Sequence, residues 1–283
     1  MGNSISPLIQ ADELLALYKS KNVIIVDVSN GISSKANYQR KHLDTAIFVD
    51  LNSQLADVKD DLSNGGRHPL PKIEDFAETL KNIGITAQGH VVIYDDKDGA
   101  NAAARFWWML KSIGHEDVQV LNGGFQQAEK IGFPVNDKVE IPKISGTYKH
   151  RGWILPIVEM KEVEQNALKE NYTVIDVREN NRYCGRNEPL DLIAGHIPGS
   201  INIPFSTNLD EDGLFLTPEK LHMKYEAIIN KNSFENVIIH CGSGVTACHT
   251  LLAIDYAGLE IPKLYVGSWS EWSRNNKNFA TEI

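Results

Sequence analysis

Residues 237–249 read VIIHCGSGVTACH, and this stretch decides the fold. Four residues suited to a buried strand lead into a glycine-rich turn, and apolar residues at helical spacing follow the turn. Cys241 is therefore predicted to lie where a strand gives way to a helix. Ligands of open α/β sheets bind beyond the carboxyl ends of the strands, which is where this cysteine falls.

The loop after Cys241 is suited to an anion. Successive backbone N–H groups of such a loop can point inward, and the positive end of the following helix adds to them. Gly242 and Gly244 allow backbone angles that a Cβ would forbid. A thiol in this place ionises readily and becomes a nucleophile. The alternative is that Cys241 is a small buried hydrophobic residue, as most free cysteines are.

The order of apolar runs and turns around this stretch occurs twice in the chain. Four pairs of landmarks match, at separations of 149 residues (Asp27 to Asp176), 154 (His42 to His196), 146 (Asp95 to Cys241) and 144 (Gly123 to Gly267). Separations that differ by no more than ten residues indicate a duplicated domain. His42 and His196 lie at matching turns, for which structural hydrogen bonding is the expected role.

The alternation of strands and helices predicts an α/β protein with two tandem domains, each a parallel sheet with helices on both faces. We expect strands at 23–28, 47–50, 90–95, 118–121, 174–178, 237–241 and 264–267, helices at about 73–80 and 102–113, and a turn plus a short helix within 5–19. The predicted domains are residues 1–134 and 156–283, joined by a linker at 135–155.

Composition narrows the classes of partner. The 283 residues suffice for two domains, and 28 basic against 37 acidic residues give a net charge of −9. This charge argues against nucleic acid or an anionic membrane as a partner, so local groups must attract any anionic substrate. The chain has no apolar run of membrane-spanning length and no signal-peptide pattern at its start, from which we expect a cytoplasmic protein. We also expect a monomer.

Three cysteines, Cys184, Cys241 and Cys248, include no Cys-x-x-Cys pair. These spacings predict neither a structural disulfide framework nor a zinc site, and we expect reduced thiols with no metal or organic cofactor. Cys184 could form a redox pair with Cys241 only if their Cα atoms lie within about 7 Å.

The loop sequence CGSGVTA resembles the active-site loop of sulfurtransferases of the rhodanese superfamily, and it is nearest to the form found in 3-mercaptopyruvate sulfurtransferases. Two further marks are the turn Gly195–Gly199 and the stretch Gly267–Trp272, and the resemblance covers nearly the whole chain. It implies transfer of a sulfane sulfur from a small anionic donor, 3-mercaptopyruvate or thiosulfate, through a Cys241 persulfide. The acceptor would be a reduced thioredoxin-like protein, a small thiol or cyanide. The first domain would be inactive, because Asp95 stands where the second has Cys241.

The resemblance also implies roles for individual residues. Besides Cys241, the catalytic candidates are Ser243, near the donor, and Thr246, as a hydroxyl donor or a helix cap. The candidates for substrate binding are Arg182, Arg186, Gly242, Gly244, Val245 and His68. Arg182 matches an arginine that holds the donor's anionic group. A second arginine of the mercaptopyruvate enzymes has no match in the shorter stretch 187–191, and Arg186 is the candidate to replace it. His68, in the loop GGRHPLP, matches a residue near the active site.

Two other functions are a cysteine phosphatase and a non-catalytic binding module. Cysteine phosphatases need an arginine six residues after the cysteine, where this chain has Ala247, so the loop cannot clamp a phosphate group. A non-catalytic sulfur carrier or regulatory binding module remains open. The preferred donor also remains open, because the loop favours 3-mercaptopyruvate and the shortened arginine region favours thiosulfate.

Overall fold

The structure is a computed structural model that describes residues 5–282, and its chain divides into two compact units. Unit 1 consists of Met1–Ala56, Pro71–Ile154 and Glu211–Leu214, and unit 2 of Asp57–Leu70, Leu155–Asp210 and Phe215–Ile283. The loop Asp57–Leu70 comes from the first third of the sequence but packs with unit 2. Two side chains of this loop are part of the site described below.

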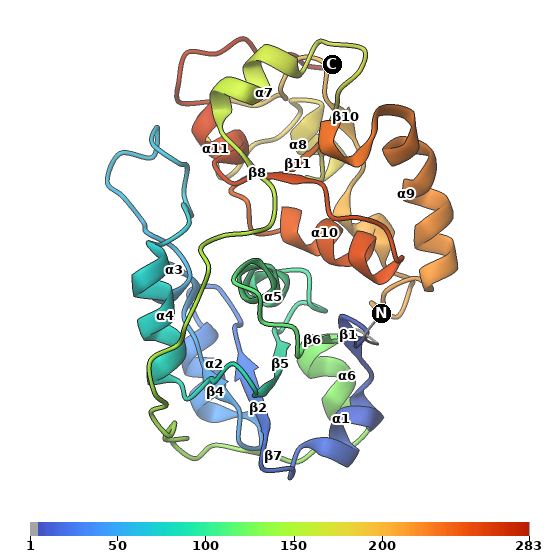
Figure 1. Ribbon diagram of the computed structural model, residues 1–283. Coiled ribbons are helices and arrows are strands. Elements are labelled where there is room, and N and C mark those ends of the chain that lie inside the picture. Colours follow the sequence, from blue (N-terminus) through green and yellow to red (C-terminus); the bar gives the residue numbers. More distant parts are fainter. Residues whose placement is uncertain (1–4, 283) are drawn as a thin grey trace. The chain divides into compact units, whose positions relative to one another are not determined.

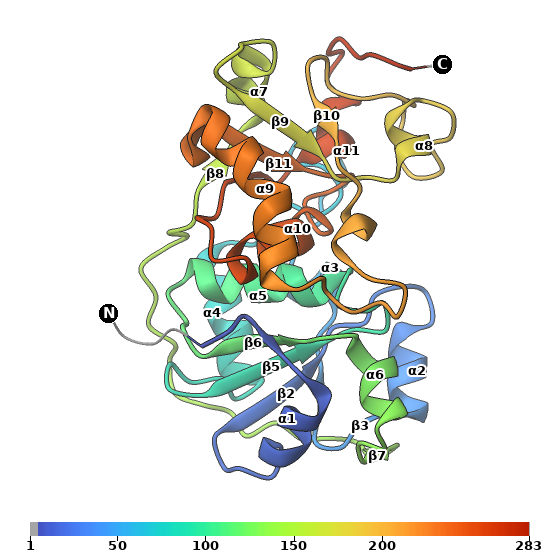
Figure 2. The ribbon, with the colours of Figure 1, turned by 90° about the vertical axis from the view of Figure 1, so that its right-hand side faces the viewer.

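Unit 1 is built on a five-stranded parallel sheet in the order β1-β6-β5-β2-β4. The strands are β1 (Leu8–Ile9), β2 (Val23–Asp27), β4 (Ile47–Phe48), β5 (His90–Tyr94) and β6 (Val118–Leu121). Helices α1 (Ala11–Leu17) and α6 (Gly124–Lys130) cover one face, and α4 (Ile73–Asn82) and α5 (Ala102–Ser112) cover the other (Figures 1 and 2). The remaining elements are α2 (Ser34–Arg40), α3 (Leu51–Gln54) and an antiparallel pair of β3 (His42–Leu43) with β7 (Val135–Asn136).

The central strands of unit 1 are apolar except at one end, Asp27 in β2 and His90 in β5, because both of their faces are covered. Ile25 of β2 and Val92 of β5 belong to a core cluster with Leu14 of α1. On α5, Trp107 and Trp108 are fully buried, as expected of core residues. Continuous apolar strands of this kind are typical of parallel sheets between two helical layers.

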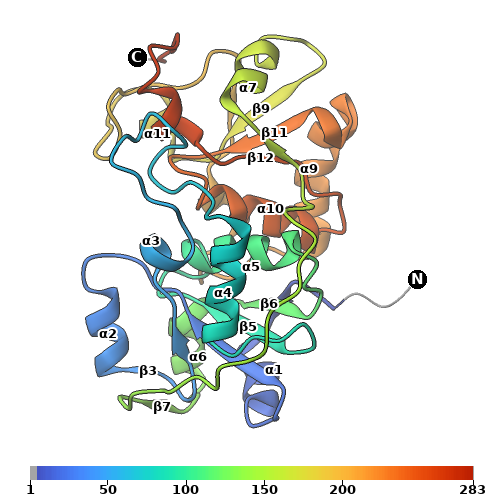
Figure 3. The same cartoon turned by 60° about the vertical axis from the view of Figure 1, so that its left-hand side comes forward.

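Unit 2 repeats this plan with a parallel sheet in the order β10-β9-β11-β12-β8. The strands are β8 (Ile157–Val158), β9 (Thr173–Asp176), β10 (Ile201–Asn202), β11 (Val237–His240) and β12 (Lys263–Tyr265). Helices α7 (Met160–Asn166) and α11 (Ser268–Trp272) lie on one face, and α9 (Pro218–Asn232) and α10 (Ala247–Tyr256) on the other (Figures 2 and 3). Helix α8 (Asn180–Tyr183) and the short 3-10 helices η1 (Phe205–Asn208) and η2 (Phe234–Asn236) lie in its loops.

The duplication extends to single hydrogen bonds. The carbonyl of Cys241 accepts the N–H of Trp269 at 3.0 Å, and the carbonyl of Asp95 accepts the N–H of Phe125 at the same distance. These bonds place Asp95 and Cys241 at equivalent positions, each directly after the central strand of its sheet. The prediction of a duplicated α/β domain is confirmed.

The two matching histidines have the same structural role, as expected. His42 contacts the carbonyl of Tyr38 through Nδ1 at 2.7 Å, and its ring stacks on the Tyr38 ring with centroids 4.0 Å apart. His196 contacts the carbonyl of Tyr183 at 2.9 Å and stacks on it at 3.8 Å. Both histidines are buried, so they hold their turns rather than reach a ligand.

Residues 5–282 contain neither a membrane-spanning helix nor a cluster of metal-binding side chains. No helix in this range combines the length and the apolar character needed to cross a membrane. The same range contains no group of three or more His, Cys, Asp or Glu side chains arranged to hold a metal ion.

Candidate active site

Cys241 follows β11 directly and is 2% exposed. Its N–H donates to the hydroxyl of Ser268 at 3.2 Å, and its carbonyl accepts the N–H of Trp269 at 3.0 Å. The carbonyl of Gly242 accepts the N–H of Ser270 at 2.8 Å. The start of α11 therefore fixes the backbone on both sides of the Cys241 thiol.

The loop between Cys241 and α10 leaves its N–H groups available. Within the described part of the chain, the N–H groups of Gly242, Ser243, Val245 and Thr246 donate to no protein acceptor. Helix α10 begins at Ala247, so these groups precede its N-terminus. Unpaired N–H groups gathered beside a buried thiol form a cradle for a negative charge.

Gly244 gives this loop its course. It has φ of +70°, and a Cβ at this position would stand 2.4 Å from the carbonyl oxygen of Val266. A side chain here would both strain the backbone and clash with the backbone of Val266, directly after β12. The glycine is therefore needed for the loop to turn back beside Cys241.

The equivalent loop of unit 1 holds an anion of its own. The carboxylate of Asp95 accepts four backbone N–H groups, from Lys97 and Gly99 at 2.9 Å and from Asn101 and Ala103 at 3.1 Å. Burial raises the pKa of Asp95 to about 6 against the opposing effect of these N–H groups, so the carboxyl is ionised at neutral pH. The chain thus contains a filled anion cradle at the position that corresponds to Cys241.

Ser243 and His68 are in contact. The hydroxyl of Ser243 lies 2.8 Å from Nδ1 of His68, although the two residues are 175 positions apart in the sequence. The His68 loop is held against α11 by the N–H of Gly65, which donates to Glu271 at 2.9 Å. Both residues were predicted from the sequence as site candidates. The structure brings them together next to Gly242.

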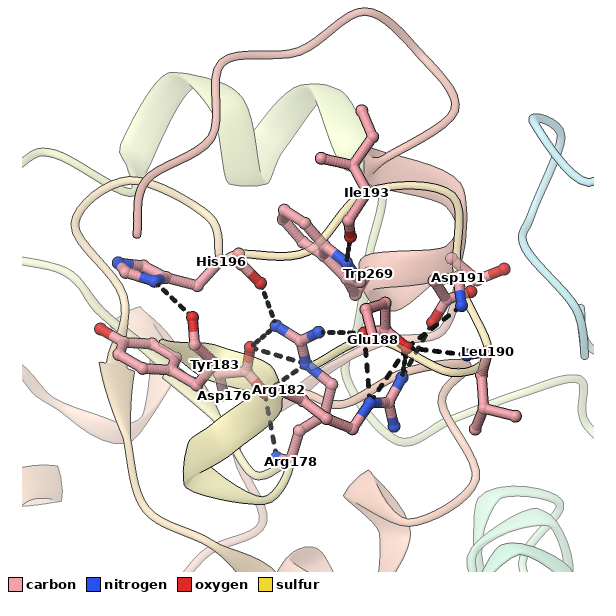
Figure 4. A network of polar contacts seen from close by, with 12 residues as sticks. Asp176, Arg178, Arg182, Tyr183, Glu188, Leu190, Asp191, Ile193, His196 and Trp269 are labelled. Carbon is pink, nitrogen blue, oxygen red and sulfur yellow. Dashed lines mark hydrogen bonds and ion pairs between the residues drawn. The ribbon is translucent and has the colours of Figure 1, made fainter. Parts of the chain in front are cut away.

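Arg182 lies at the end of α8 and binds two buried carboxylates (Figure 4). Its Nη2 is 2.7 Å from Glu188 and 3.1 Å from Asp191, and its Nε is 3.1 Å from both oxygens of Glu188. The side chains of Glu188 and Asp191 are 3% and 0% exposed, whereas that of Arg182 is 17% exposed. The carboxylates fix the guanidinium while part of it stays accessible.

Two more arginines reach the same aspartate. Nη1 of Arg67 forms an ion pair with Oδ1 of Asp191, and Nη1 of Arg274 lies 3.1 Å from the same oxygen. The sequence analysis did not identify Arg67, Arg274 and Asp191 as site residues. It also did not identify Glu188, the other carboxylate that binds Arg182. Arg67 directly precedes His68 in the loop GGRHPLP, and that neighbourhood is the signal that could have found it.

The other candidates have varied surroundings. Arg186 is exposed, and within the described residues its side chain forms no hydrogen bond or ion pair. Val245 is 4% exposed in the cradle loop. Thr246 is the N-cap residue of α10, but its side chain makes no capping hydrogen bond. The buried thiol of Cys184 faces Asn180 and Glu282, at 3.5 and 3.6 Å, and Cys184 forms no disulfide.

Comparison with known proteins gives consistent results. A probable 3-mercaptopyruvate sulfurtransferase of Pseudomonas aeruginosa is 34% identical to this chain over 275 residues, 95% of each protein. The thiosulfate sulfurtransferase of Mus musculus is 33% identical over 85% of this chain and 80% of that protein. The solved structure of the 3-mercaptopyruvate sulfurtransferase from Leishmania major is similar with a TM-score of 0.80 at 27% identity, covering 94% of this chain and 74% of that one.

The family model for the rhodanese-like domain matches twice, at residues 10–130 and 159–275. These two matches coincide with the two sheets and their helices, and the second contains the Cys241 loop. The chain therefore belongs to the rhodanese-like family, as a tandem pair of its domains.

Proposed function

We propose that this protein is a sulfurtransferase that carries a sulfane sulfur on Cys241. The observation that carries the proposal is the set of unpaired N–H groups around a buried cysteine at the end of β11. The loop at Asp95 supports it, because the carboxyl group at the equivalent position accepts several backbone N–H groups of that loop. Relatives named for two different donors also support sulfur transfer as the common reaction.

In the first step the Cys241 thiolate attacks the transferable sulfur of the donor. A sulfur–sulfur bond forms at Sγ, and the bond between that sulfur and the rest of the donor breaks, with its electron pair leaving on the departing group. From 3-mercaptopyruvate that group is the enolate of pyruvate, which must take up a proton. From thiosulfate it is sulfite, which needs none.

In the second step a thiolate or cyanide attacks the outer sulfur of the persulfide. The bond to Sγ breaks, and its electron pair restores the Cys241 thiolate. The N–H groups of Gly242, Ser243, Val245 and Thr246 stabilise the persulfide anion between the steps. We propose small thiols, a reduced thioredoxin-like protein or cyanide as acceptors, in a reducing compartment such as the cytoplasm, where three free cysteines persist.

The persulfide itself provides the direct test. Purified protein incubated with 3-mercaptopyruvate or thiosulfate, without an acceptor, should gain the mass of one sulfur atom, and peptide mapping should locate it on Cys241. Adding cyanide should remove the extra mass and release thiocyanate. A chain that binds a donor but never gains this sulfur would instead be the non-catalytic binding module.

The contact between His68 and Ser243 gives a second prediction that separates the donors. We propose that His68 supplies, through Ser243, the proton that the pyruvate enolate requires. Replacing His68 by glutamine should lower kcat with 3-mercaptopyruvate roughly a hundredfold, the usual size of a general-acid contribution. With thiosulfate, kcat of the same variant should stay within about threefold of wild type, because sulfite leaves unprotonated. An equal loss with both donors would argue against a proton relay.

A further inference from the structure

Gly242 lies beneath two guanidinium groups. A Cβ on Gly242 would stand 3.1 Å from Nη2 of Arg67, and 3.3 and 3.4 Å from Nη2 and Nη1 of Arg182. The two arginines come from different segments, the loop Asp57–Leu70 and the end of α8, and both belong to unit 2. They converge on the residue that follows Cys241, and the missing side chain of Gly242 leaves the space between them open.

Two guanidinium nitrogens beside Gly242 have N–H groups that donate to no acceptor in residues 5–282. Arg67 uses Nη1 for Asp191, and Arg182 uses Nε and Nη2 for Glu188 and Asp191. Across residues 5–282, Nη2 of Arg67 and Nη1 of Arg182 have no acceptor. Both nitrogens lie within 3.4 Å of the position that a Cβ on Gly242 would take, so their unused N–H groups are on the same side of this residue.

Asp191 makes this approach of two cations possible. It lies between them, with Oδ1 on Arg67 and Oδ2 on Arg182 at 3.1 Å, and its side chain is fully buried. It also binds Arg274 at 3.1 Å, which anchors it to α11. Without the carboxylate the two guanidinium groups would repel each other. Asp191 is therefore a positioning residue for the pair.

The charges of the cluster do not balance. Arg67, Arg178, Arg182 and Arg274 carry four positive charges, and Asp176, Glu188 and Asp191 carry three negative charges, among side chains that are at most 22% exposed. The difference of one positive charge lies in a protein whose net charge is −9. This local positive charge attracts a negatively charged ligand, although the protein as a whole is acidic.

We propose that Arg67 and Arg182 together bind the carboxylate of the sulfur donor, with Arg67 as the second substrate-binding arginine. The inference rests on the proposed function and adds Arg67, a residue from a distant segment of the chain, to its donor site. Guanidinium N–H groups pair with the two oxygens of a carboxylate in one plane. The position over Gly242 places the carboxylate beside Cys241, with the rest of the donor within reach of the thiol.

The test compares Arg67→Gln with Arg151→Gln as a control. Arg151 is an exposed arginine of unit 1 without a side-chain partner in the described chain. With 3-mercaptopyruvate, Arg67→Gln should raise KM about 10- to 100-fold and change kcat less than threefold, as expected for the loss of a charged hydrogen bond. Arg151→Gln should leave both constants within about twofold. Arg67→Lys, which keeps the charge but loses the planar fork, should fall between wild type and Arg67→Gln.

The methyl ester of 3-mercaptopyruvate separates binding from a structural effect. The ester lacks the negative charge, so Arg67→Gln and wild type should use it with equal kcat/KM. Equal losses with acid and ester would mean that Arg67 only holds the loop, and an unchanged KM for the acid would also overturn the proposal. Calorimetric binding of pyruvate does not depend on turnover. If wild type transferred no sulfur, the proposed function would fail. Weaker pyruvate binding by Arg67→Gln would still support this inference, and unchanged binding would refute it.

Discussion

Replacing Cys241 by serine should lower sulfur transfer at least about a thousandfold with either donor, because the variant has no atom that can form a persulfide. A hydroxyl at this position stays protonated at neutral pH, and it is a far weaker nucleophile toward the donor's sulfur than a thiolate. The change replaces one small, 2% exposed side chain by another of the same shape. The fold should therefore survive. Thiocyanate formation from cyanide measures the effect.

Cys184→Ser is the matched control for this experiment. Cys184 is also buried in unit 2, but its thiol faces Asn180 and Glu282, and its role is packing. The control variant should keep its rate within about twofold of wild type. If Cys241→Ser retained activity while the donor was still consumed, another nucleophile would have to carry the sulfur, and the mechanism at Cys241 would be wrong.

The sequence was sufficient for the parts of the fold that repeat. Central strands such as β5 and β11 are mostly apolar runs. Each is followed directly by one of the two equivalent residues, Asp95 or Cys241. The edge strands β1 and β8 were not predicted, because two residues are too short to show a period. Residues 5–19 were expected to form a turn and a helix, and Leu8–Ile9 instead pairs with β6 at the sheet edge.

The site could be predicted only where its residues adjoin Cys241. Helix and strand patterns report local structure, whereas the contact between Ser243 and His68 joins two distant segments. The loop Asp57–Leu70 lies in the first third of the sequence, and no local pattern indicates that it packs with unit 2. For this reason the sequence indicates only Arg186, the nearest arginine in sequence, as a second arginine. Arg67 became visible as a candidate only from its distance to Gly242.

Asp27 and Asp176 show how the two units differ at another equivalent pair. Each ends a central strand, and each accepts the N–H of the residue two positions later, Ser29 at 2.8 Å or Arg178 at 3.0 Å. Burial raises the pKa of Asp27. Burial alone would also raise the pKa of Asp176, but the Arg178 guanidinium outweighs it and holds that pKa below its ordinary value. The same buried position is thus stabilised as an ion pair only in unit 2.

Arg178 is the centre of that network (Figure 4). Its side chain is 1% exposed, and Nη2 donates to Asp176 at 2.6 Å and to the carbonyl of Gly195 at 2.7 Å. Nη1 lies 3.1 Å from Glu188, and the guanidinium stacks 4.8 Å from the Trp269 ring. The network therefore joins the end of β9 to the loop that carries Glu188, next to Arg182.

Replacing Arg178 by methionine should lower the free energy of unfolding by about 3–5 kcal/mol at pH 7, because it leaves Asp176 charged and buried without its main partner. The loss should shrink as the pH is lowered toward 4. In wild type the low pKa of Asp176 contributes stability above its unfolded-state pKa, and this contribution is lost as the pH falls through the folded-state value. In the variant, unopposed burial raises the pKa of Asp176, so the variant's stability falls as the pH rises. Urea unfolding between pH 4 and 8 measures both curves.

The double variant Asp176→Asn, Arg178→Met isolates the buried charge as the cause. Asparagine has nearly the same shape as aspartate and needs no cation, so the double variant should be more stable at pH 7 than Arg178→Met alone. Its stability should also lose the pH dependence that Asp176 gives the single variant. If both variants were equally destabilised at every pH, the lost contacts of Arg178 with Gly195, Glu188 and Trp269 would explain the effect, and the ion pair would be incidental to the stability of unit 2.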